Sequence, residues 1–211
     1  MAKIEDSAVG VINDALVLLR QDKGITLSEF TGETDSVLGR KCRSVYDSCR
    51  EEVLLARKWA FVIRRCELSS RLDSDHKTWM ASLPHFVIAI KKVRGINGRE
   101  IRDWERRGPE CLASSEKIFS VEYVEDVRNI GQWPTFVRRA LVFALARDLA
   151  IPITGRQKDL ETMNALYVDK LKQAAMHDAC DEKPDRTIWG RNVYADRIRG
   201  TFEHRERGRV I

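Results

Sequence analysis

The sequence lacks any uninterrupted apolar run near the roughly 20 residues that a membrane-spanning helix requires. Its first ten residues, MAKIEDSAVG, also lack the basic region followed by an apolar stretch that is typical of a signal peptide. We therefore expect a chain that is made in the cytoplasm and has no membrane partner. With 43% hydrophobic and 33% charged residues in 211, it can bury a core as one domain, or as one domain with an insertion.

The sequence has only five cysteines. This number is odd, and no two of them form a CxxC pair. A disulfide framework and a zinc site would both need closely matched pairs. Cys42 and Cys49 are seven residues apart, so they would lie on one helix face as small buried side chains. The four histidines are scattered singly, and the DSDH stretch at 73–76 is typical of a solvated loop. The sequence therefore predicts no metal site and no cofactor.

Signatures of catalysis are missing as well. There is no Walker-type phosphate loop, no HExxH and no GxSxG. The GINGRE stretch at 95–100 has the composition of a hairpin turn, and no carboxylate pair has the apolar flanks that would raise a pKa. We predict that the protein is not an enzyme and has no catalytic residue.

Apolar residues recur at helical spacing in four segments. They predict helices at 7–20, at 35–59, at 134–151 and from 155 to about 181. The third is apolar nearly all round, which predicts a central helix. The second has a narrower apolar stripe, and its outer face is expected to carry Arg50 and its charged neighbours.

Two prolines and one capping pair are expected to set the ends of the last two helices. Pro134 is expected to open the third helix, where proline is tolerated, and Pro152 to stop it. Thr154 and Gln157 are three residues apart, which predicts a capping box at the start of the fourth helix. The short link between the two helices predicts an antiparallel pair.

The helical period fades between residues 62 and 124. Short β-branched or aromatic runs replace it, and turn sequences separate them, which predicts strands and hairpins. The Trp59–Phe61 and Trp133–Pro134 pairs flank this region. We interpret them as sealing the junction between the helices and the strands, although they are also candidate aromatic binding surfaces.

The predicted fold class is therefore α+β and mainly α. It is a four-helix bundle with a small β-hairpin or sheet inserted between the second and third helices, followed by an extended C-terminal arm. The boundaries assign 1–61 and 125–182 to the bundle, 62–124 to the inserted β region and 183–211 to the arm.

Charge is concentrated in that arm. Residues 183–211 contain eight Lys/Arg and four Asp/Glu, a net +4 of the +5 carried by the whole chain. The arm has too few apolar residues for its own core, so we expect it to be ordered only against a partner. Arginine, tryptophan and tyrosine often anchor protein interfaces, whereas nucleic-acid contact and a solvated tail are the alternatives. The predicted partner-binding residues are Arg186, Trp189, Arg191, Tyr194, Arg197, Arg199, Phe202, Arg205, Arg207 and Arg209.

Four pieces of the sequence, in their order and spacing, carry a resemblance to a known family. They are LLARKWAFVIRRCEL at 54–68, SLPHFVIAIKKV at 82–93, FSVEYVEDVRNIGQWPTFVRRAL at 119–141 and ALARDLAIPITGRQKDLETMNALYVDKLKQAAMHDA at 144–179. Within them stand Trp59 and Phe61, the pair Leu83 and Pro84, and the motif around Pro152. Together they resemble the tail tubular protein A family of short-tailed phages.

That resemblance implies a structural role in the virion. Members of the family form a dodecameric ring, the adaptor or gatekeeper between the portal protein of the capsid and the nozzle protein of the tail. Double-stranded DNA passes through the lumen without specific binding. The chain would accordingly be a head-tail connector in the phage neck. The alternatives are a small basic nucleic-acid-binding protein and a carbohydrate-degrading tail component.

Overall fold

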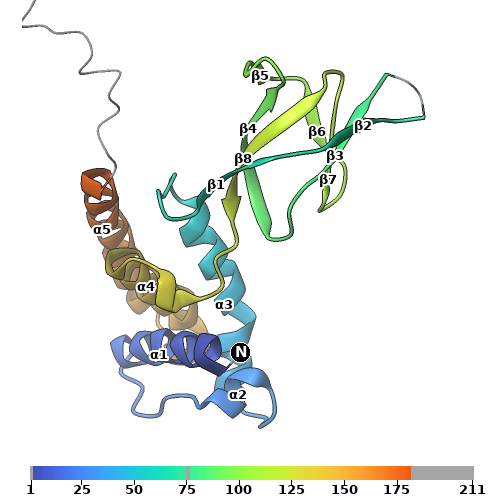
Figure 1. The fold of residues 1–211 in the computed structure, drawn as a ribbon. Helices are drawn as coiled ribbons and strands as arrows, with labels where there is room; N and C mark the ends of the chain where they lie inside the picture. The colour runs from blue at the N-terminus through green and yellow to red at the C-terminus, as the bar shows by residue number, and fades with distance from the viewer. Residues whose placement is uncertain (1, 75–76, 182–211) are drawn as a thin grey trace, which may run out of the picture. The chain divides into compact units, whose positions relative to one another are not determined.

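The computed structural model describes residues 2–74 and 77–181, and the side chains of 7–74 and 77–179 (Figure 1). Residues 1–178 form one compact unit. Helices from the two ends of this unit make a helical part, and strands between Ile63 and Glu125 make a β part. The described residues contain five α-helices and two antiparallel sheets of four strands each.

The predicted architecture of a four-helix bundle with a small hairpin insertion is wrong. The inserted region is a β part with eight strands and its own apolar core, too large to be a hairpin on a bundle. The helical part also contains a short helix that was not predicted. The arm at 183–211 lies outside the described residues.

The centre of the helical part is α4, Thr135–Thr154. It packs against α1, Ala2–Leu18, and α3, Val37–Leu55, and its side chains are buried on several sides. The prediction of a central helix is therefore confirmed. Its fully buried leucines, Leu141, Leu145 and Leu149, belong to the larger of the two apolar cores.

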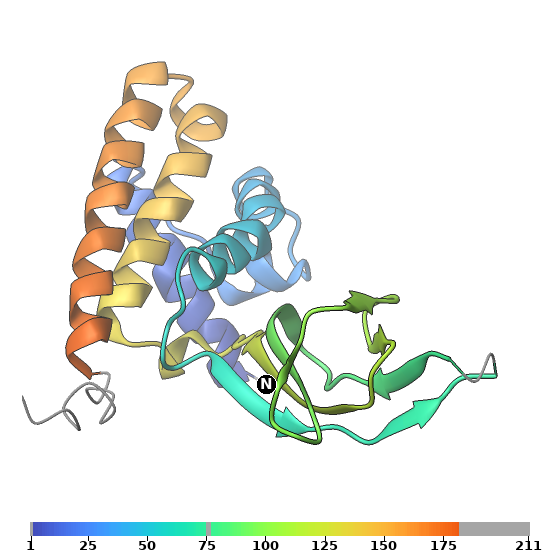
Figure 2. The ribbon, with the colours of Figure 1, turned by 90° about the horizontal axis from the view of Figure 1, so that it is seen from above.

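Helix α5, Gln157–Asp181, follows α4 after a short turn and ends at the predicted residue. Figure 2 shows α4 and α5 side by side along much of their length. The inner face of α5 is formed by Tyr167 and Ala174, which are buried, and by Leu160, Met163 and Leu171, which pack against the core.

The two ends of α4 differ from the prediction. Helix α4 begins at Thr135 with Pro134 as its N-cap, and Pro152 lies inside the last turn instead of ending the helix. Gly155 ends α4 with φ of 67°, a left-handed conformation that suits glycine, and its N–H donates to the Ile151 carbonyl.

The predicted capping box at this turn is wrong. The Thr154 hydroxyl accepts from Arg156 N at 3.2 Å and donates to the Ala150 carbonyl at 2.9 Å. The described residues show no bond from the Gln157 side chain back to Thr154. The Thr154 hydroxyl therefore bonds within the last turn of α4 and does not form a capping box for α5.

A capping box does occur before α2, Leu27–Thr31. Glu29 N donates to Thr26 Oγ1 at 3.3 Å, and Thr26 N donates to Glu29 Oε2 at 2.8 Å. Helix α3 then starts after Ser36 and ends at Leu55, four residues before the predicted end at Trp59. Trp59 consequently lies in the connection to the β part.

The β part consists of two antiparallel sheets. The first has the order β1-β8-β4-β5, with bounds Ile63–Glu67, Ile118–Glu125, Val87–Gly95 and Glu100–Ile101. The second has the order β2-β3-β7-β6, with bounds Ser70–Leu72, Trp79–Ser82, Cys111–Ser114 and Trp104–Arg106. Side chains from both sheets, among them Val93, Leu112 and Val121, form the smaller core. A 3-10 turn, η1 at Ile130–Gln132, leads back to α4.

Among the described residues, no helix combines the length and apolar character needed to cross a bilayer.

Candidate interaction sites

Two connections join the helical part to the β part: residues 56–62, which we call the first crossing, and residues 126–134, the second crossing. Each contains a buried tryptophan. Trp59 is fully buried, and its Nε1 donates to the Val53 carbonyl at 2.7 Å. Trp133 is 3% exposed, and its Nε1 donates to the Val127 carbonyl at 2.9 Å. Both indoles thus bond a carbonyl six residues earlier and belong to the larger core. The interpretation that these residues seal the junction agrees with this arrangement.

Further contacts connect the two crossings to each other and to α5. The Phe61 ring lies 5.8 Å from the Trp133 ring, centroid to centroid. The Asp178 carboxylate, near the end of α5, accepts from Ala60 N at 3.3 and 3.4 Å. Three segments that are distant in sequence therefore meet at the first crossing.

A buried ion pair reinforces the second crossing. The side chains of Arg50 on α3 and Asp126, just after β8, are 3% and 9% exposed and share a charge-assisted hydrogen bond. Burial opposes the charge on Arg50, but the hydrogen bond that Arg50 donates to Asp126 and the nearby negative charges together outweigh burial, so the pKa of Arg50 is raised. Asp126 also accepts from Arg128 Nε at 2.9 Å. The expectation that Arg50 lies on the outer face of its helix is wrong.

We define the Phe86 knob as Phe86 with the flanking residues His85 and Arg128. It borders a cavity of about 370 Å³ beside the buried ion pair. Phe86 has φ of 70°, a left-handed conformation that costs a non-glycine residue roughly 1–3 kcal/mol. Its carbonyl accepts from Asp126 N at 2.7 Å, and Arg128 Cζ lies 5.6 Å from its ring centroid. Strain of this kind persists where the surroundings fix the conformation, and it is common at functional sites.

A polar cluster links α3, α4 and α5. Arg147 Nη1 and Nη2 donate to the two Glu52 oxygens at 2.9 and 2.6 Å. Arg147 Nε donates to Asp148 at 2.7 Å, and Cys49 Sγ donates to the same carboxylate at 3.1 Å. The guanidinium also lies 4.9 Å from the centroid of the Tyr167 ring. This network fixes how the three helices align.

We expect part of the stability from this cluster to disappear in acid. The pKa of Glu52 is lowered from 4.5, first by its hydrogen bond from Arg147. A lowered folded pKa stabilises the protein above about pH 4.5, and the effect is lost as pH falls through the folded value. Glu52→Gln should therefore be less stable than wild type near neutral pH, and the difference should shrink in acid. Urea unfolding over a pH series measures it, and a difference that stayed constant below pH 4.5 would contradict the assignment.

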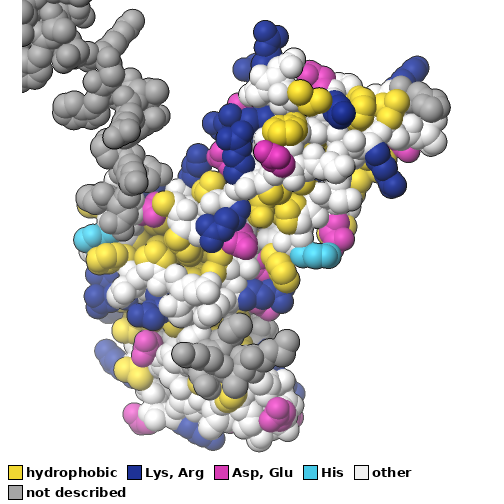
Figure 3. Space-filling model, in the orientation of Figure 1, with side chains coloured by type: hydrophobic (Ala, Val, Ile, Leu, Met, Phe, Trp, Pro, Cys, Tyr) yellow, Lys and Arg dark blue, Asp and Glu magenta, His cyan; other side chains and the backbone are white. Residues whose placement is uncertain are grey.

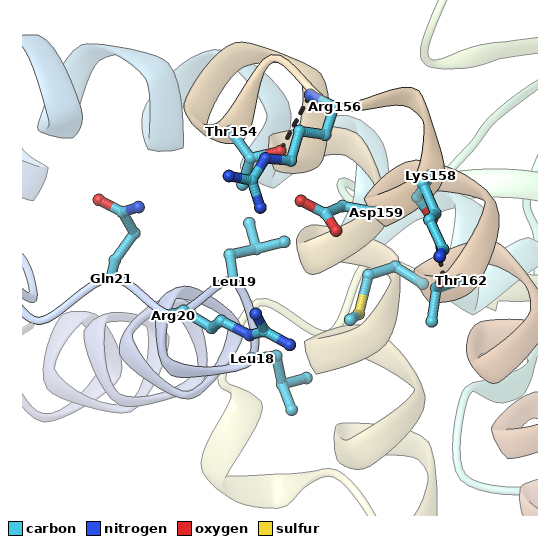
Figure 4. A pocket seen from close by; sticks show the side chains of 10 residues that line it. Leu18, Leu19, Arg20, Gln21, Thr154, Arg156, Lys158, Asp159 and Thr162 are labelled. Carbon is cyan, nitrogen blue, oxygen red and sulfur yellow. Dashed lines mark hydrogen bonds between the residues drawn. The ribbon is translucent and has the colours of Figure 1, made fainter.

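A hollow of about 540 Å³ lies between the end of α1 and the start of α5. Figure 4 shows Arg20, Arg156 and Lys158 around it, with the Asp159 carboxylate between them. Leu18 and Leu19 form its floor. The dashed bonds in the figure join Arg156 N to Thr154, and Thr162 to the Lys158 carbonyl. The lining contains both positively and negatively charged side chains, and it presents no nucleophile paired with a base.

The cysteines of α3 are protected in this fold. Cys42 and Cys49 are both fully buried. Burial raises the pKa of Cys42 to about 11, and burial followed by the bond to Asp148 raises the pKa of Cys49 further. The predicted role as small buried side chains on one face is confirmed for both. No group of three or more His, Cys, Asp or Glu in the described part of the chain could hold a metal ion.

We expect this protection to be visible in alkylation. Because the thiolate is the reactive species, iodoacetamide should modify the half-buried Cys111 in the native protein and leave Cys42 and Cys49 unmodified. All three should react in urea. Peptide mass spectrometry provides the readout, and native labelling of Cys42 or Cys49 at the rate of Cys111 would contradict the fold of α3.

The remaining predicted site residues have separate outcomes. Leu83 is 5% exposed in the core of the β part, and Pro84 follows it directly before the Phe86 knob. The predicted arm residues between 186 and 209 lie outside the described residues. The sequence reading missed the Phe86 knob and the Arg50–Asp126 pair. No residue pattern around Phe86 indicated the knob.

Comparison of the sequence with protein-family models and with curated proteins gives no match.

Proposed function

We propose that the chain is a structural head-to-tail adaptor of a short-tailed phage, similar to tail tubular protein A. Copies of it would form a ring between the portal and the tail nozzle, with the DNA passing through the lumen. In this proposal the protein catalyses no reaction, and its work is to join two rings and keep the channel continuous.

The observation that supports this proposal is the pair of crossings between the helical part and the β part. Two of the four pieces of sequence that resemble the adaptor family run through the two crossings. The piece at 54–68 contains Trp59 and leads into β1, and the piece at 119–141 runs from β8 through Trp133 into α4. The residues that carry the resemblance are therefore also those that join the helical part to the β part.

An adaptor has a physical reason for such a junction. A subunit that contacts one ring through its helical part and another through its β part transmits load through the connection between them. The indole bonds and the buried Arg50–Asp126 pair fix that connection with directional contacts. Packed elements with few alternative arrangements transmit displacement instead of absorbing it.

The alternative of a nucleic-acid-binding protein rests on the basic arm. Outside the arm, residues 1–182 carry a net charge of only +1. On the face shown in Figure 3, Lys and Arg side chains are spread out and interspersed with acidic ones. Tight binding of phosphate backbones needs several clustered cations, so we favour the adaptor.

Deletion of residues 183–211 tests the proposed role of the arm. We expect the truncated chain to keep the helix content and melting temperature of the full chain, because the core residues in the described part of the chain all precede position 183. Attachment to the portal of the same phage should be lost in co-sedimentation. Normal attachment of the truncated chain would remove the arm from the proposal.

The same truncated chain separates the adaptor from the nucleic-acid-binding alternative. Without the arm, an adaptor should bind double-stranded DNA weakly and lose that binding as salt rises. A fluorescence titration at physiological salt measures it, with the full chain as the comparison. Tight binding by the truncated chain would favour the alternative.

A further inference from the structure

The Phe86 knob has the features of an interface anchor that lacks its partner. The Phe86 side chain is 59% exposed although it is large and apolar. Its backbone conformation is held by the bond to Asp126, and its ring lies between Arg128 and His85. An aromatic side chain that is fixed before binding loses little freedom on docking, which favours affinity.

The helical part has an apolar groove of suitable size. It lies between α1 and α4, has a volume of about 250 Å³, and is lined by Asp14, Val17, Leu18, Arg139, Val142 and Phe143. Val17 is 69% exposed on its rim. A benzene ring fits a cavity of about 150 Å³, so this groove can accept a phenylalanine side chain.

The charges around the knob and the groove are complementary. Asp14 and Arg139 stand at the groove, and neither pairs with another charge among the described residues. The knob has an arginine and a carboxylate beside it, Arg128 and Glu110, both well exposed. Docking of Phe86 in the groove would let Arg128 meet Asp14 and Glu110 meet Arg139.

We propose that the Phe86 knob of one copy of this chain docks in the α1–α4 groove of the next copy. The knob belongs to the β part, and Figures 1 and 2 show α1 running away from the β part toward the end that carries Val17. The two surfaces of one copy therefore engage two different neighbours. Such a heterologous contact generates rings when its rotation closes. The inference rests on the proposed adaptor ring and specifies the contact that would build it.

Disulfide trapping between copies tests this contact. Phe86→Cys and Val17→Cys chains are mixed at high concentration under mild oxidation. They should give a covalent dimer, whereas each alone should not. Ile96→Cys and Val37→Cys form the matched control pair, because these side chains are 59% and 62% exposed on the β part and the helical part. We expect at least a roughly tenfold excess of dimer over the control pair, which corresponds to about 1.4 kcal/mol of preference.

A chain that carries both Phe86→Cys and Val17→Cys distinguishes head-to-tail contact from a symmetric dimer. It should give a ladder of covalent oligomers on a denaturing gel, because each copy then links to two neighbours. Excess wild-type chain should suppress the ladder, because it competes for the contact. Excess of a chain that carries both Phe86→Ala and Val17→Asp should not suppress it. Equal yields from the experimental and control pairs would overturn the proposal.

The remaining outcomes separate this inference from the adaptor function. Trapping that appears only after deletion of residues 183–211 would show that the arm fills the groove, and would overturn the docking of Phe86 in the full chain. Portal binding by wild type without selective trapping would overturn the contact and leave the adaptor standing. Selective trapping without portal binding would support the contact and reject the adaptor.

Discussion

Asp126→Ala is expected to lower the free energy of unfolding by roughly 3–5 kcal/mol, the usual cost of removing one partner of a buried ion pair. The Arg50 guanidinium would remain buried at the second crossing without its main carboxylate. Asp47 and Glu51 also approach it, at 3.3 and 3.9 Å, but both are exposed and cannot replace Asp126. Urea unfolding followed by circular dichroism measures the change.

Asp47→Ala is the matched control, because Asp47 bonds the same guanidinium but its side chain is 78% exposed. Exposed ion pairs contribute about 0–1 kcal/mol, so this variant should stay close to wild type. Equal losses in the two variants would mean that Arg50 does not depend on Asp126, and that the second crossing is not clamped by this pair.

Trp133→Ala is expected to destabilise the protein by roughly 3–5 kcal/mol, as large-to-small changes of buried aromatic residues do. The change removes the indole from the larger core, its contact with Phe61 and the bond to the Val127 carbonyl. Trp59→Ala should have an effect of the same size, because Trp59 occupies the equivalent position at the first crossing.

The phenylalanine variants separate packing from hydrogen bonding. Trp59→Phe keeps most of the apolar contact but leaves the buried Val53 carbonyl without its donor, at a cost of about 1–3 kcal/mol. Thermal and urea unfolding should place it between wild type and Trp59→Ala. A Trp59→Phe variant as stable as wild type would mean that the indole bond contributes nothing to the junction.

The long helices were predictable because their apolar residues repeat over many turns. The central helix α4 and the inner face of α5 follow from that period, and the structure places Leu145 and Tyr167 accordingly. The β-branched and aromatic runs at 61–68, 85–93 and 117–124 likewise correspond to β1, β4 and β8, which are neighbours in the first sheet.

The second sheet was not predictable from the same signals. Its strands are three or four residues long, and β2 and β6 include exposed positions without a clear alternation. Short polar strands acquire their structure from pairing with neighbours, so period and propensity carry little information about them. In the stretch at 95–116, the sequence indicated a hairpin turn at 95–100 but did not identify the individual strands β5, β6 and β7.

Two threonines, each three residues before a Glu or Gln, show how local patterns depend on context. The spacing of Thr26 and Glu29 forms a real box, whereas the same spacing of Thr154 and Gln157 does not. The difference is that α4 continues through Pro152 to Thr154, so the threonine belongs to the preceding helix.

The site residues were found only in part, for a similar reason. Tryptophans beside turn residues were visible in the sequence, and the interpretation that they seal the junction agrees with where they lie. Arg50 looked like a solvated charge because its partner, Asp126, lies 76 residues further along the chain. The strain at Phe86 depends on a backbone angle that no residue pattern around it reveals.

Electron microscopy of the chain mixed with the portal protein of the same phage tests the central claim most directly. The proposed adaptor predicts end-on views of a ring stacked on the portal, and a particle mass that exceeds the portal alone by a whole ring of copies of the 24.3 kDa chain. A chain that remained a monomer or dimer beside an unchanged portal would contradict it.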